Sequence, residues 1–296
     1  MAIVNSLGRM AMAFLMVLGI GCGRARSSSA PAWNNQRDVA YGSSSLQALD
    51  VYQPPGRTGA TPRPAIVFIH GGGWTGGDKD DFKFLADYFA QQGYVTFSMN
   101  YRMVLSPELR YPVPYDDAQR AMRFIRTHAA GFGIDPRRVG ALGASAGGHL
   151  AGLLGTTDSR DNSVPGLASA SSRPTCVVDL YGPMDLVTPL PTKPKDLDWL
   201  ARNLIGDTRK NAPQLYREAS PIAHIDSHTA PFLIFHGTQD TTVPQAQSQA
   251  FDTALKAKGI ESELVIFPNE GHGFMVEANY VIFAQKALAF FDRHLK

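Results

Sequence analysis

The residues of this 296-residue chain that could do chemistry together are a serine, an aspartate and a histidine, each beside glycine or in a glycine-containing segment. Ser145 lies in GASAG at positions 143–147, Asp240 in HGTQD and His272 in NEGHGF. A serine hydroxyl becomes a nucleophile when a histidine takes its proton and a carboxylate orients that histidine and stabilises its charged form. The residue types therefore predict Ser145 as nucleophile, His272 as base and Asp240 as orienting acid.

Each of these three residues follows an apolar run typical of a strand buried on both faces. The runs are 139–143, 232–236 and 263–267. Open α/β sheets bind ligands at the carboxyl ends of their strands, so we expect Ser145, Asp240 and His272 to meet there. Taken alone, each has a simpler interpretation: a Gly-rich turn, a solvated loop carboxylate and a surface or capping histidine. Asp185 is a weaker alternative for the acid.

A glycine loop, HGGGW at positions 70–74, directly follows another buried run. Three glycines let the backbone approach a ligand without obstruction by side chains. The amides of Gly72, Gly73 and Ala146 are the predicted donors to an oxyanion. A flexible loop and a phosphate cradle are the alternatives, but no Lys-Ser/Thr pair follows the glycines, as a phosphate cradle would require.

Strand-like and helix-like segments alternate along the chain, which predicts βαβ units and a mainly parallel sheet. The expected strands are 46–52 (an early edge strand), 65–70, 95–100, 139–143, 176–181, 232–236 and 263–267. The expected helices are 81–92, 115–130, 145–154, 197–205, 245–258 and 279–295. The proline-rich segment 183–230 interrupts this rhythm. Because long connections in compact domains are usually functional, it is predicted to form a small cap over the site.

The N-terminus has the pattern of an export signal over residues 1–22, in which Arg9 precedes a short apolar stretch. Residues 18–22 resemble a bacterial lipoprotein signal that would place a lipid on Cys22, although Gly19 occupies the usual leucine position. Ordinary cleavage near 25–30 and a buried N-terminal helix are the alternatives. A linker is expected over 23–36 and one catalytic domain over 37–296. Cys176 is then left alone, which predicts no intramolecular disulfide.

The composition is that of a globular protein, with 44% hydrophobic and 18% charged residues. The formal net charge is only +2 and no Lys/Arg-rich tract is present, so no nucleic-acid partner is expected. His224 and His228 have no metal-ligand neighbours in the sequence, so no metal is expected. His70 and His236 end strands beside glycine, and we interpret them as structural histidines.

The segments HGGGW, NYR at 100–102, GASAGGHL at 143–150, HGTQD and EGHGF together resemble the esterase/lipase branch of the α/β-hydrolases. The resemblance covers roughly residues 40–296. It is strongest to small bacterial carboxylesterases, including enzymes like feruloyl and acetylxylan esterases. It implies an α/β-hydrolase fold with about eight strands, a Ser-Asp-His triad in the chain order found here, and no cofactor.

Members similar to hormone-sensitive lipase carry a helical cap before the glycine loop, for which residues 31–64 are too short and too rich in proline. The role of the cap therefore moves to 183–230. The residues expected to line the pocket are Trp74, Tyr181, Met184, Trp199 and Phe274.

The expected activity is hydrolysis of short-chain or small aromatic acyl esters through an acyl-enzyme, on small molecules or on acylated plant polysaccharide. An amide hydrolase, such as a formamidase or a dipeptidyl-peptidase-like enzyme, is the alternative within enzymes. A non-catalytic binding protein on the same fold is the alternative outside them. Export would make the protein periplasmic, secreted or lipid-anchored, with membrane contact only through Cys22. The sequence leaves the oligomeric state open.

Overall fold

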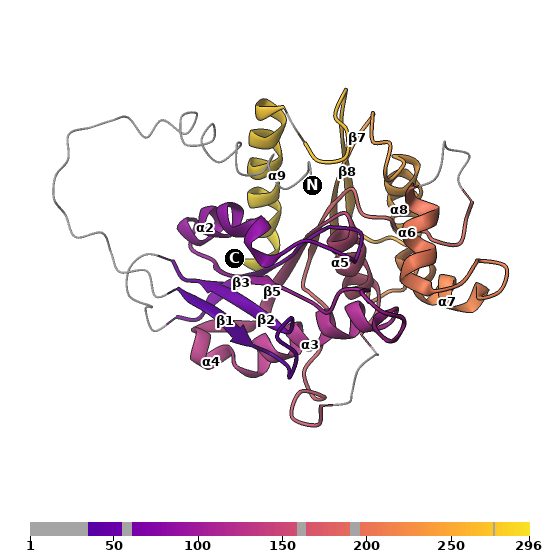
Figure 1. Cartoon of the computed structure of the whole chain (residues 1–296). Coiled ribbons are helices and arrows are strands. Elements are labelled where there is room, and N and C mark those ends of the chain that lie inside the picture. The colour runs from indigo at the N-terminus through magenta and orange to yellow at the C-terminus, as the bar shows by residue number, and fades with distance from the viewer. Residues whose placement is uncertain (1–34, 55–60, 159–163, 190–195, 275) are drawn as a thin grey trace.

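A computed structural model describes residues 35–54, 61–158, 164–189, 196–274 and 276–296 (Figure 1). The predicted signal, with Cys22, and nearly all of the predicted linker 23–36 lie outside the described residues. Within the described part, no helix is both long enough and apolar enough to cross a membrane.

The centre of the molecule is one eight-stranded sheet with the strand order β1-β2-β4-β3-β5-β6-β7-β8. The strands are β1 (Gln36–Ala40), β2 (Ala48–Tyr52), β3 (Arg63–Ile69), β4 (Val95–Met99), β5 (Ile134–Ala144), β6 (Val177–Leu180), β7 (Phe232–Gly237) and β8 (Ser262–Phe267). β1 and β2 run antiparallel to their neighbours, and the other six strands are parallel to one another. The carboxyl ends of the six parallel strands therefore share one edge of the sheet.

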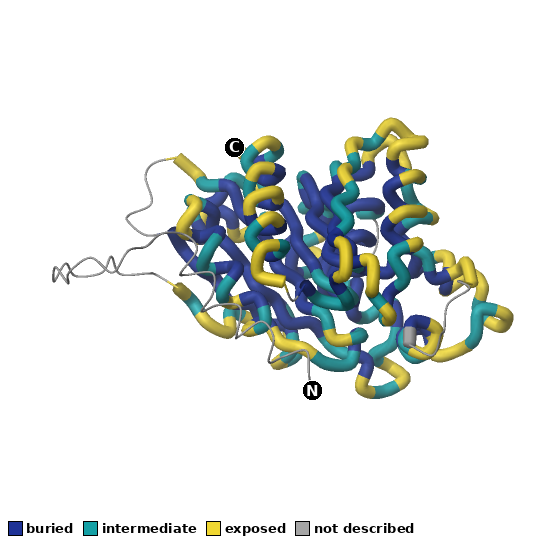
Figure 2. Tube along the Cα trace, turned by 90° about the horizontal axis from the view of Figure 1, so that it is seen from above, coloured by how far each residue is buried: buried dark blue, intermediate teal, exposed yellow. Residues whose placement is uncertain are grey.

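Helices cover both faces of this sheet, as Figures 1 and 2 show. α2 (Lys83–Gln91) and α9 (Glu277–Leu295) lie on one face, and α3 (Val113–Thr127), α5 (Ala146–Thr156) and α8 (Ala246–Ala257) lie on the other. The short elements are η1 (Lys79–Phe82), η2 (Pro107–Leu109), α4 (Ala129–Phe132), α6 (Asp196–Ile205), α7 (Pro213–Glu218) and η3 (Pro221–His224). Of these, α6, α7 and η3 belong to the segment 183–230.

The core has one apolar layer on each face of the sheet because successive side chains of a strand point to opposite sides. On β3, Ile66 and Phe68 pack in the layer that contains α2 and α9. Val67 and Ile69 pack in the layer that contains α3, α5 and α8. The central strands are therefore mostly apolar along their whole length, without the alternation of a strand that has one face in solvent.

The predicted fold class is confirmed, including the eight-stranded and mostly parallel sheet. Three details differ from the expectation. β1 was not predicted, because its sequence QRDVA is mostly exposed and lacks an apolar run. Consequently β2 is not an edge strand: it pairs with β1 on one side and β4 on the other. β5 begins five residues earlier than expected, because its first half, IDPRR, is charged and partly exposed.

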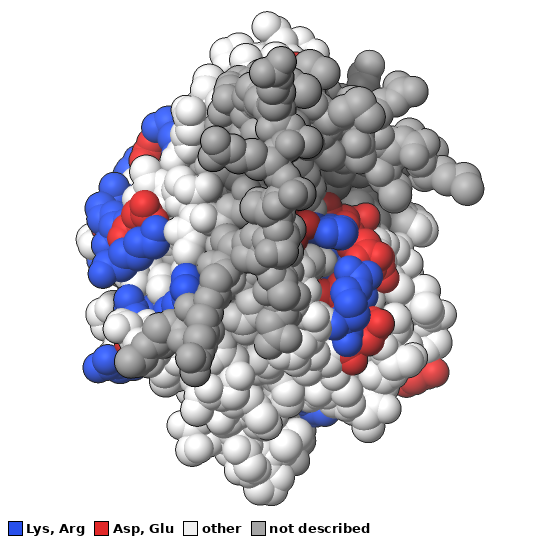
Figure 3. Space-filling view, turned by 90° about the vertical axis from the view of Figure 1, so that its left-hand side faces the viewer, with Lys and Arg blue, Asp and Glu red and all other residues white. Residues whose placement is uncertain are grey.

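Charged side chains of both signs are mixed on the surface. Figure 3 shows Lys and Arg beside Asp and Glu in the larger charged clusters of that face, with uncharged surface between them. Ion pairs such as Lys83–Asp87 at 2.6 Å and Lys286–Glu263 at 2.8 Å bring opposite charges together. Exposed pairs of this kind contribute little to stability, but interspersed signs keep any single-sign field small.

Candidate active site

Ser145 occupies a sharp turn between β5 and α5. Its backbone has φ 54° and ψ −118°, in the left-handed region that residues other than glycine rarely adopt. A Cβ on Gly143 would lie 2.1 Å from the carbonyl oxygen of Gly147, and a Cβ on Gly147 would lie 2.0 Å from that of Ile69. Both positions therefore require glycine. The close approach of Gly147 to Gly143 and Ile69 brings the start of α5 against the sheet, and this forms the turn.

The three residues expected to act together do meet at the carboxyl edge of the sheet. His272 Nε2 lies 2.9 Å from Ser145 Oγ, and His272 Nδ1 lies 2.7 Å from Asp240 Oδ2. Both distances are those of direct hydrogen bonds. The backbone of Ser145 is itself tied to β6, because its N–H donates to the Leu180 carbonyl at 2.8 Å.

Asp240 is held on both carboxylate oxygens. Oδ1 accepts the backbone N–H groups of Thr242 at 2.9 Å and Val243 at 2.8 Å, while Oδ2 faces His272 and also His236, at 3.3 Å. Burial by itself would raise the pKa of Asp240. Hydrogen bonds from His236, His272 and the Val243 amide outweigh burial and hold that pKa well below its usual value. Asp240 is therefore a carboxylate at neutral pH.

Asp185, the alternative acid, has a different role. Its Oδ1 accepts the backbone N–H groups of Val187 at 2.8 Å and Thr188 at 3.0 Å, which closes a turn at the start of the segment 183–230. His272 Nδ1 bonds to Asp240.

The glycine loop lies directly against the serine turn. A Cβ on Gly71 would lie 3.2 Å from Ser145 Cβ, and Gly72 and Gly73 have φ values of +105° and +60°. Ala146 is the first residue of α5, so its N–H has no acceptor within the helix. The start of α5 thus brings the Ala146 N–H and the positive end of the helix dipole next to Ser145, and the glycine loop lies against the same turn.

Two further histidines near the site are neutral. His149, one turn after Ser145 on α5, is fully buried, and burial lowers its pKa to about 4. Its Nε2 lies 2.6 Å from the Ala219 carbonyl. Burial also lowers the pKa of His70, whose ring stacks on Tyr101 with centroids 4.4 Å apart. Neither ring bonds to Ser145, and His272 is the imidazole that does.

Tyr181 is the one predicted pocket residue that contacts a proposed catalytic side chain. Its ring centroid lies 4.7 Å from that of His272. Its backbone N–H donates to the Phe235 carbonyl at 2.9 Å, and its φ is +46°. Burial raises the pKa of Tyr181, so the phenol stays neutral and supplies packing for the imidazole.

Three other predicted pocket residues are buried in the core. Trp74 is 1% exposed and meets His149 edge-on at 5.1 Å. Met184 is fully buried with its sulfur against Gly152, and Phe274 packs among Phe235, Phe267 and Phe283. These apolar side chains fill the space around the site from within, because the interior is close-packed.

Trp199 was also predicted as a pocket wall, but it is exposed to solvent rather than buried. It is 61% exposed on α6, whose buried face is formed by Leu197, Ala201 and Leu204. The helical period places Trp199 on the far side from that face. Leu200 is the α6 side chain that reaches the glycine loop, since a Cβ on Gly73 would lie 2.7 Å from Leu200 Cδ2.

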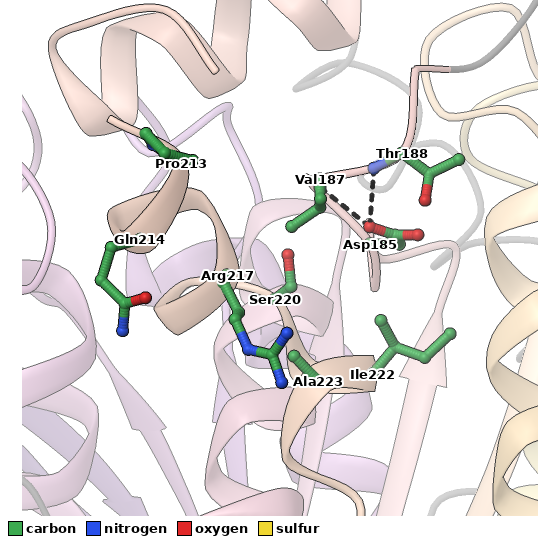
Figure 4. Close-up of a pocket in the computed structure, with 9 residues that line it drawn as sticks. All are labelled: Asp185, Val187, Thr188, Pro213, Gln214, Arg217, Ser220, Ile222 and Ala223. Atoms are coloured by element: carbon green, nitrogen blue, oxygen red, sulfur yellow. Dashed lines mark hydrogen bonds between the residues drawn. The ribbon is translucent and has the colours of Figure 1, made fainter. Parts of the chain in front are cut away.

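The segment 183–230 also contains a cavity of about 440 Å³ (Figure 4). The nine lining residues are Asp185, Val187, Thr188, Pro213, Gln214, Arg217, Ser220, Ile222 and Ala223. Figure 4 shows the Arg217 side chain extending from α7 past Ser220, with Asp185 on the other side. This cavity is lined by neither the glycine loop nor Ser145, Asp240 or His272, so it is separate from the chemistry described above.

Three contacts of the site region were not expected from the sequence, those of His236, Ser248 and Leu200. His236 was interpreted as structural, yet its ring lies beside Asp240. Ser248 and Leu200 were not singled out, because their contacts with His236 and Gly73 depend on how the helices pack on the sheet. Only for His236 did the sequence carry a signal, in its position four residues before Asp240. Within the described residues, no group of three or more metal-ligating side chains is found.

The sheet and the two helical layers are those of an α/β-hydrolase, with a Ser-Asp-His arrangement at the strand ends. The chain belongs to the BD-FAE family, whose model matches residues 49–255. It is 31% identical to Esterase LipC of Mycobacterium tuberculosis over 81% of this chain. It spans 60% of the length of LipC, and 58% and 51% of two further curated relatives.

Two solved structures are similar over nearly their full length. A truncated carbohydrate esterase from gut microbiota superposes with a TM-score of 0.77 at 26% identity, covering 90% of this chain and 98% of that one. The propionate-bound esterase Est2 of Thermogutta terrifontis superposes with a TM-score of 0.72 at 30% identity, covering 90% and 96%. These likenesses extend across the sheet and both helical layers.

Proposed function

We propose that this protein is a serine carboxylic-ester hydrolase in which Ser145, His272 and Asp240 form the catalytic triad. The observation that carries the proposal is the 2.9 Å contact between Ser145 Oγ and His272 Nε2 at a strained strand-to-helix turn. A backbone held in this conformation presents the hydroxyl at the sheet edge, as nucleophilic serines require. Its relatives named as esterases add independent support.

In the first half of the reaction, His272 Nε2 takes the proton from Ser145 Oγ as the oxygen attacks the ester carbonyl carbon. The carbonyl oxygen becomes an oxyanion, stabilised by the amides of Gly72 or Gly73 and Ala146. The tetrahedral intermediate then collapses: the bond to the alcohol oxygen breaks, His272 gives its proton to that oxygen, and the acyl group stays on Ser145.

In the second half, His272 takes a proton from water while the water oxygen attacks the acyl carbon. Collapse breaks the bond to Ser145 Oγ, which regains the proton from His272, and the free acid leaves. Asp240 accepts the Nδ1–H of His272 throughout and stabilises the imidazolium that forms twice in each cycle. Its low pKa keeps it ionised for this role.

The proposed substrates are short-chain or small aromatic acyl esters, including acyl groups on plant polysaccharide. The Est2 structure holds propionate and another similar structure is described as a carbohydrate esterase, which supports this class of substrate. The segment 183–230 is proposed as the cap over the site, because Leu200 of α6 reaches Gly73 in the oxyanion loop. No cofactor and no metal takes part in the proposed reaction.

The test compares wild type with Ser145→Ala on p-nitrophenyl acetate, on methyl ferulate, on acetylated xylan and on matched anilides. We expect ester turnover by the wild type, loss of at least about 1,000-fold in Ser145→Ala, and covalent labelling of wild type alone by an active-site phosphonate. Ester turnover at near wild-type rate in Ser145→Ala would overturn the assignment. Faster anilide than ester turnover would instead indicate an amide hydrolase, and absence of labelling a binding protein.

We also propose that the protein is exported from a bacterial cell, through the signal pattern in residues 1–22. Mass spectrometry of the mature N-terminus tests this directly. We expect a chain beginning at a lipid-modified Cys22 or near residues 25–30. An intact Met1 in the native host would contradict export, and an unmodified N-terminus after cleavage would contradict lipid anchoring.

A further inference from the structure

His236 is a fully buried histidine that the reaction above leaves unused. It lies in β7, and its ring lies between Asp240, the loop that follows it, and α8. Nε2 is 2.8 Å from the Val243 carbonyl oxygen and 3.3 Å from Asp240 Oδ2. Nδ1 is 2.7 Å from Ser248 Oγ. Both ring nitrogens therefore have polar partners in the interior.

These contacts decide which nitrogen carries the proton. A carbonyl oxygen only accepts, so the 2.8 Å contact with Val243 requires a proton on Nε2. In the neutral ring Nδ1 is then an acceptor, and the Ser248 hydroxyl donates to it. The Nε2–H bonds to the Val243 carbonyl at 2.8 Å, and Asp240 Oδ2 lies 3.3 Å from the same nitrogen.

We propose that His236, held by Ser248, is a positioning residue for Asp240: it donates a hydrogen bond to the same carboxylate oxygen that accepts from His272. The proposal rests on the triad proposed above. It adds a relay, meaning here a chain of hydrogen bonds that runs from Ser248 through His236 to Asp240. All three side chains of this relay are buried, so water does not compete for these bonds.

The geometry gives this donor two effects on the reaction. With Oδ1 fixed by the amides of Thr242 and Val243, a second donor on Oδ2 fixes the plane of the carboxylate and so the line toward His272 Nδ1. It also takes up part of the negative charge on Oδ2. Without the donor, more of the negative charge on Oδ2 faces His272, which favours the charged ring over the neutral ring that accepts the serine proton.

Other titratable groups face this cluster and enter the design of the test. Asp179 of β6 is fully buried, and burial raises its pKa to about 7 although the neighbouring His236 opposes that change. The Tyr181 ring lies against His272, and burial raises the pKa of its phenol. Glu270, in the loop before His272, accepts the Val276 N–H at 2.9 Å. Asp179 is the one whose ionisation falls in the pH range of the measurement.

The main experiment compares His236→Leu with His236→Gln in the full chain. Leucine fills much of the ring volume but has no donor, whereas the glutamine amide nitrogen can reach the position of Nε2. For each variant, kcat and KM for p-nitrophenyl acetate are measured from pH 5 to 9, together with the Tm. We expect His236→Leu to lower kcat roughly 10- to 100-fold with KM nearly unchanged, because displacing a catalytic group slows the reaction without weakening substrate binding.

The pH profile separates positioning from packing. We expect the acid limb of kcat/KM to move to higher pH in His236→Leu and to return toward the wild-type position in His236→Gln. The difference between His236→Leu and His236→Gln should persist when each is combined with Asp179→Asn, which removes the titration of Asp179. A variant that lost only packing would change the Tm without moving the limb.

Ser248→Ala is the second, milder variant and keeps the proposal testable if His236→Leu does not fold. Loss of its hydroxyl removes the bond that holds His236 through Nδ1, so the ring is less well oriented and we expect a smaller fall in kcat and a limb shift in the same direction. Unchanged kcat and an unchanged limb in Ser248→Ala would overturn the proposal, and so would unchanged values in a folded His236→Leu. So would equal losses in His236→Gln and His236→Leu. Failure of the triad itself would appear separately, as activity retained in Ser145→Ala.

Discussion

The carboxyl edge of the sheet and the segment 183–230 are built on opposite principles. At the sheet edge, Ser145 is fixed by glycine contacts on both sides, and both oxygens of Asp240 are held by donors. In the segment, three of the six exposed large hydrophobic side chains of the described residues are found: Val187, Trp199 and Leu215. Its Asp198–Arg209 ion pair, at 2.6 Å, is partly exposed.

This difference indicates that the two regions have different roles. Catalytic groups must be held within a fraction of an ångström, which requires several contacts for each atom and leaves few substitutions tolerated. A region that meets varied substrates needs surface rather than rigidity, and loops with exposed side chains supply it. We therefore expect chemistry to depend on the sheet edge and substrate choice to depend on the segment.

The largest difference in kcat between the two regions is expected when one aspartate in each is replaced by asparagine. Asp240→Asn should lower kcat about 10,000-fold, because an amide can no longer hold His272 in the tautomer that accepts the serine proton. Asp198→Asn, in the segment, should leave kcat within about twofold, since its partly exposed pair with Arg209 is far weaker. Steady-state kinetics on p-nitrophenyl acetate check both, and similar losses in the two variants would contradict the comparison.

Two glycines extend the comparison to the free energy of unfolding. A Cβ on Gly147 meets a backbone oxygen at 2.0 Å, so Gly147→Ala should cost about 4 kcal/mol or more of unfolding free energy and displace the Ser145 turn. Gly131 of α4 has open space around the same position, so Gly131→Ala should stay within about 1 kcal/mol of wild type. Urea unfolding measures both, and a mild effect at Gly147 would show that the turn can relax.

Asp179 predicts a pH dependence of stability at the sheet edge. Burial raises its pKa to about 7, and within the described residues its Oδ2 has no hydrogen-bond partner. The unfolded chain ionises this carboxyl near pH 4, so the folded state binds the extra proton between about pH 4 and 7, and its stability falls as the pH rises through that range.

Asp179→Asn stays neutral in both states and should escape this loss. Its stability relative to wild type should therefore rise by as much as about 4 kcal/mol between pH 4 and pH 8. The hydrogen bond from Gly182 to Oδ1, at 3.0 Å, has an acceptor in either side chain. Urea unfolding at several pH values gives the difference, and a gap that does not change with pH would refute the assignment.

The smallest effect is expected at Trp199. Because it is 61% exposed, Trp199→Ala should change the unfolding free energy by less than about 0.5 kcal/mol. The matched variant Trp74→Ala, in the core beside His149, should cost several times more, since it leaves a cavity. Thermal unfolding of the pair tests this, and a large loss at Trp199 would show that the segment packs more tightly than its exposure indicates.

Much of the fold was predictable because its central strands are buried on both faces. β3, β4, β6 and β7 are mostly apolar and fully or almost fully buried, and the edge strand β8 is partly buried; each was expected within about two residues of its observed ends. β1 escaped because an exposed edge strand has no apolar run. The position of Ser145 was equally readable, since the glycines beside it are required by the turn itself.

The sequence by itself determined the fold class and brought Ser145, Asp240 and His272 to one edge, because strand burial and residue type are local properties of the chain. The tertiary structure decided which aromatic residues face the site. Trp74 and Phe274 became core and Trp199 stayed in solvent, since those outcomes depend on how α6 and the sheet pack together. It also placed His236 beside Asp240, through a contact with Ser248 of α8 that no spacing in the sequence predicts.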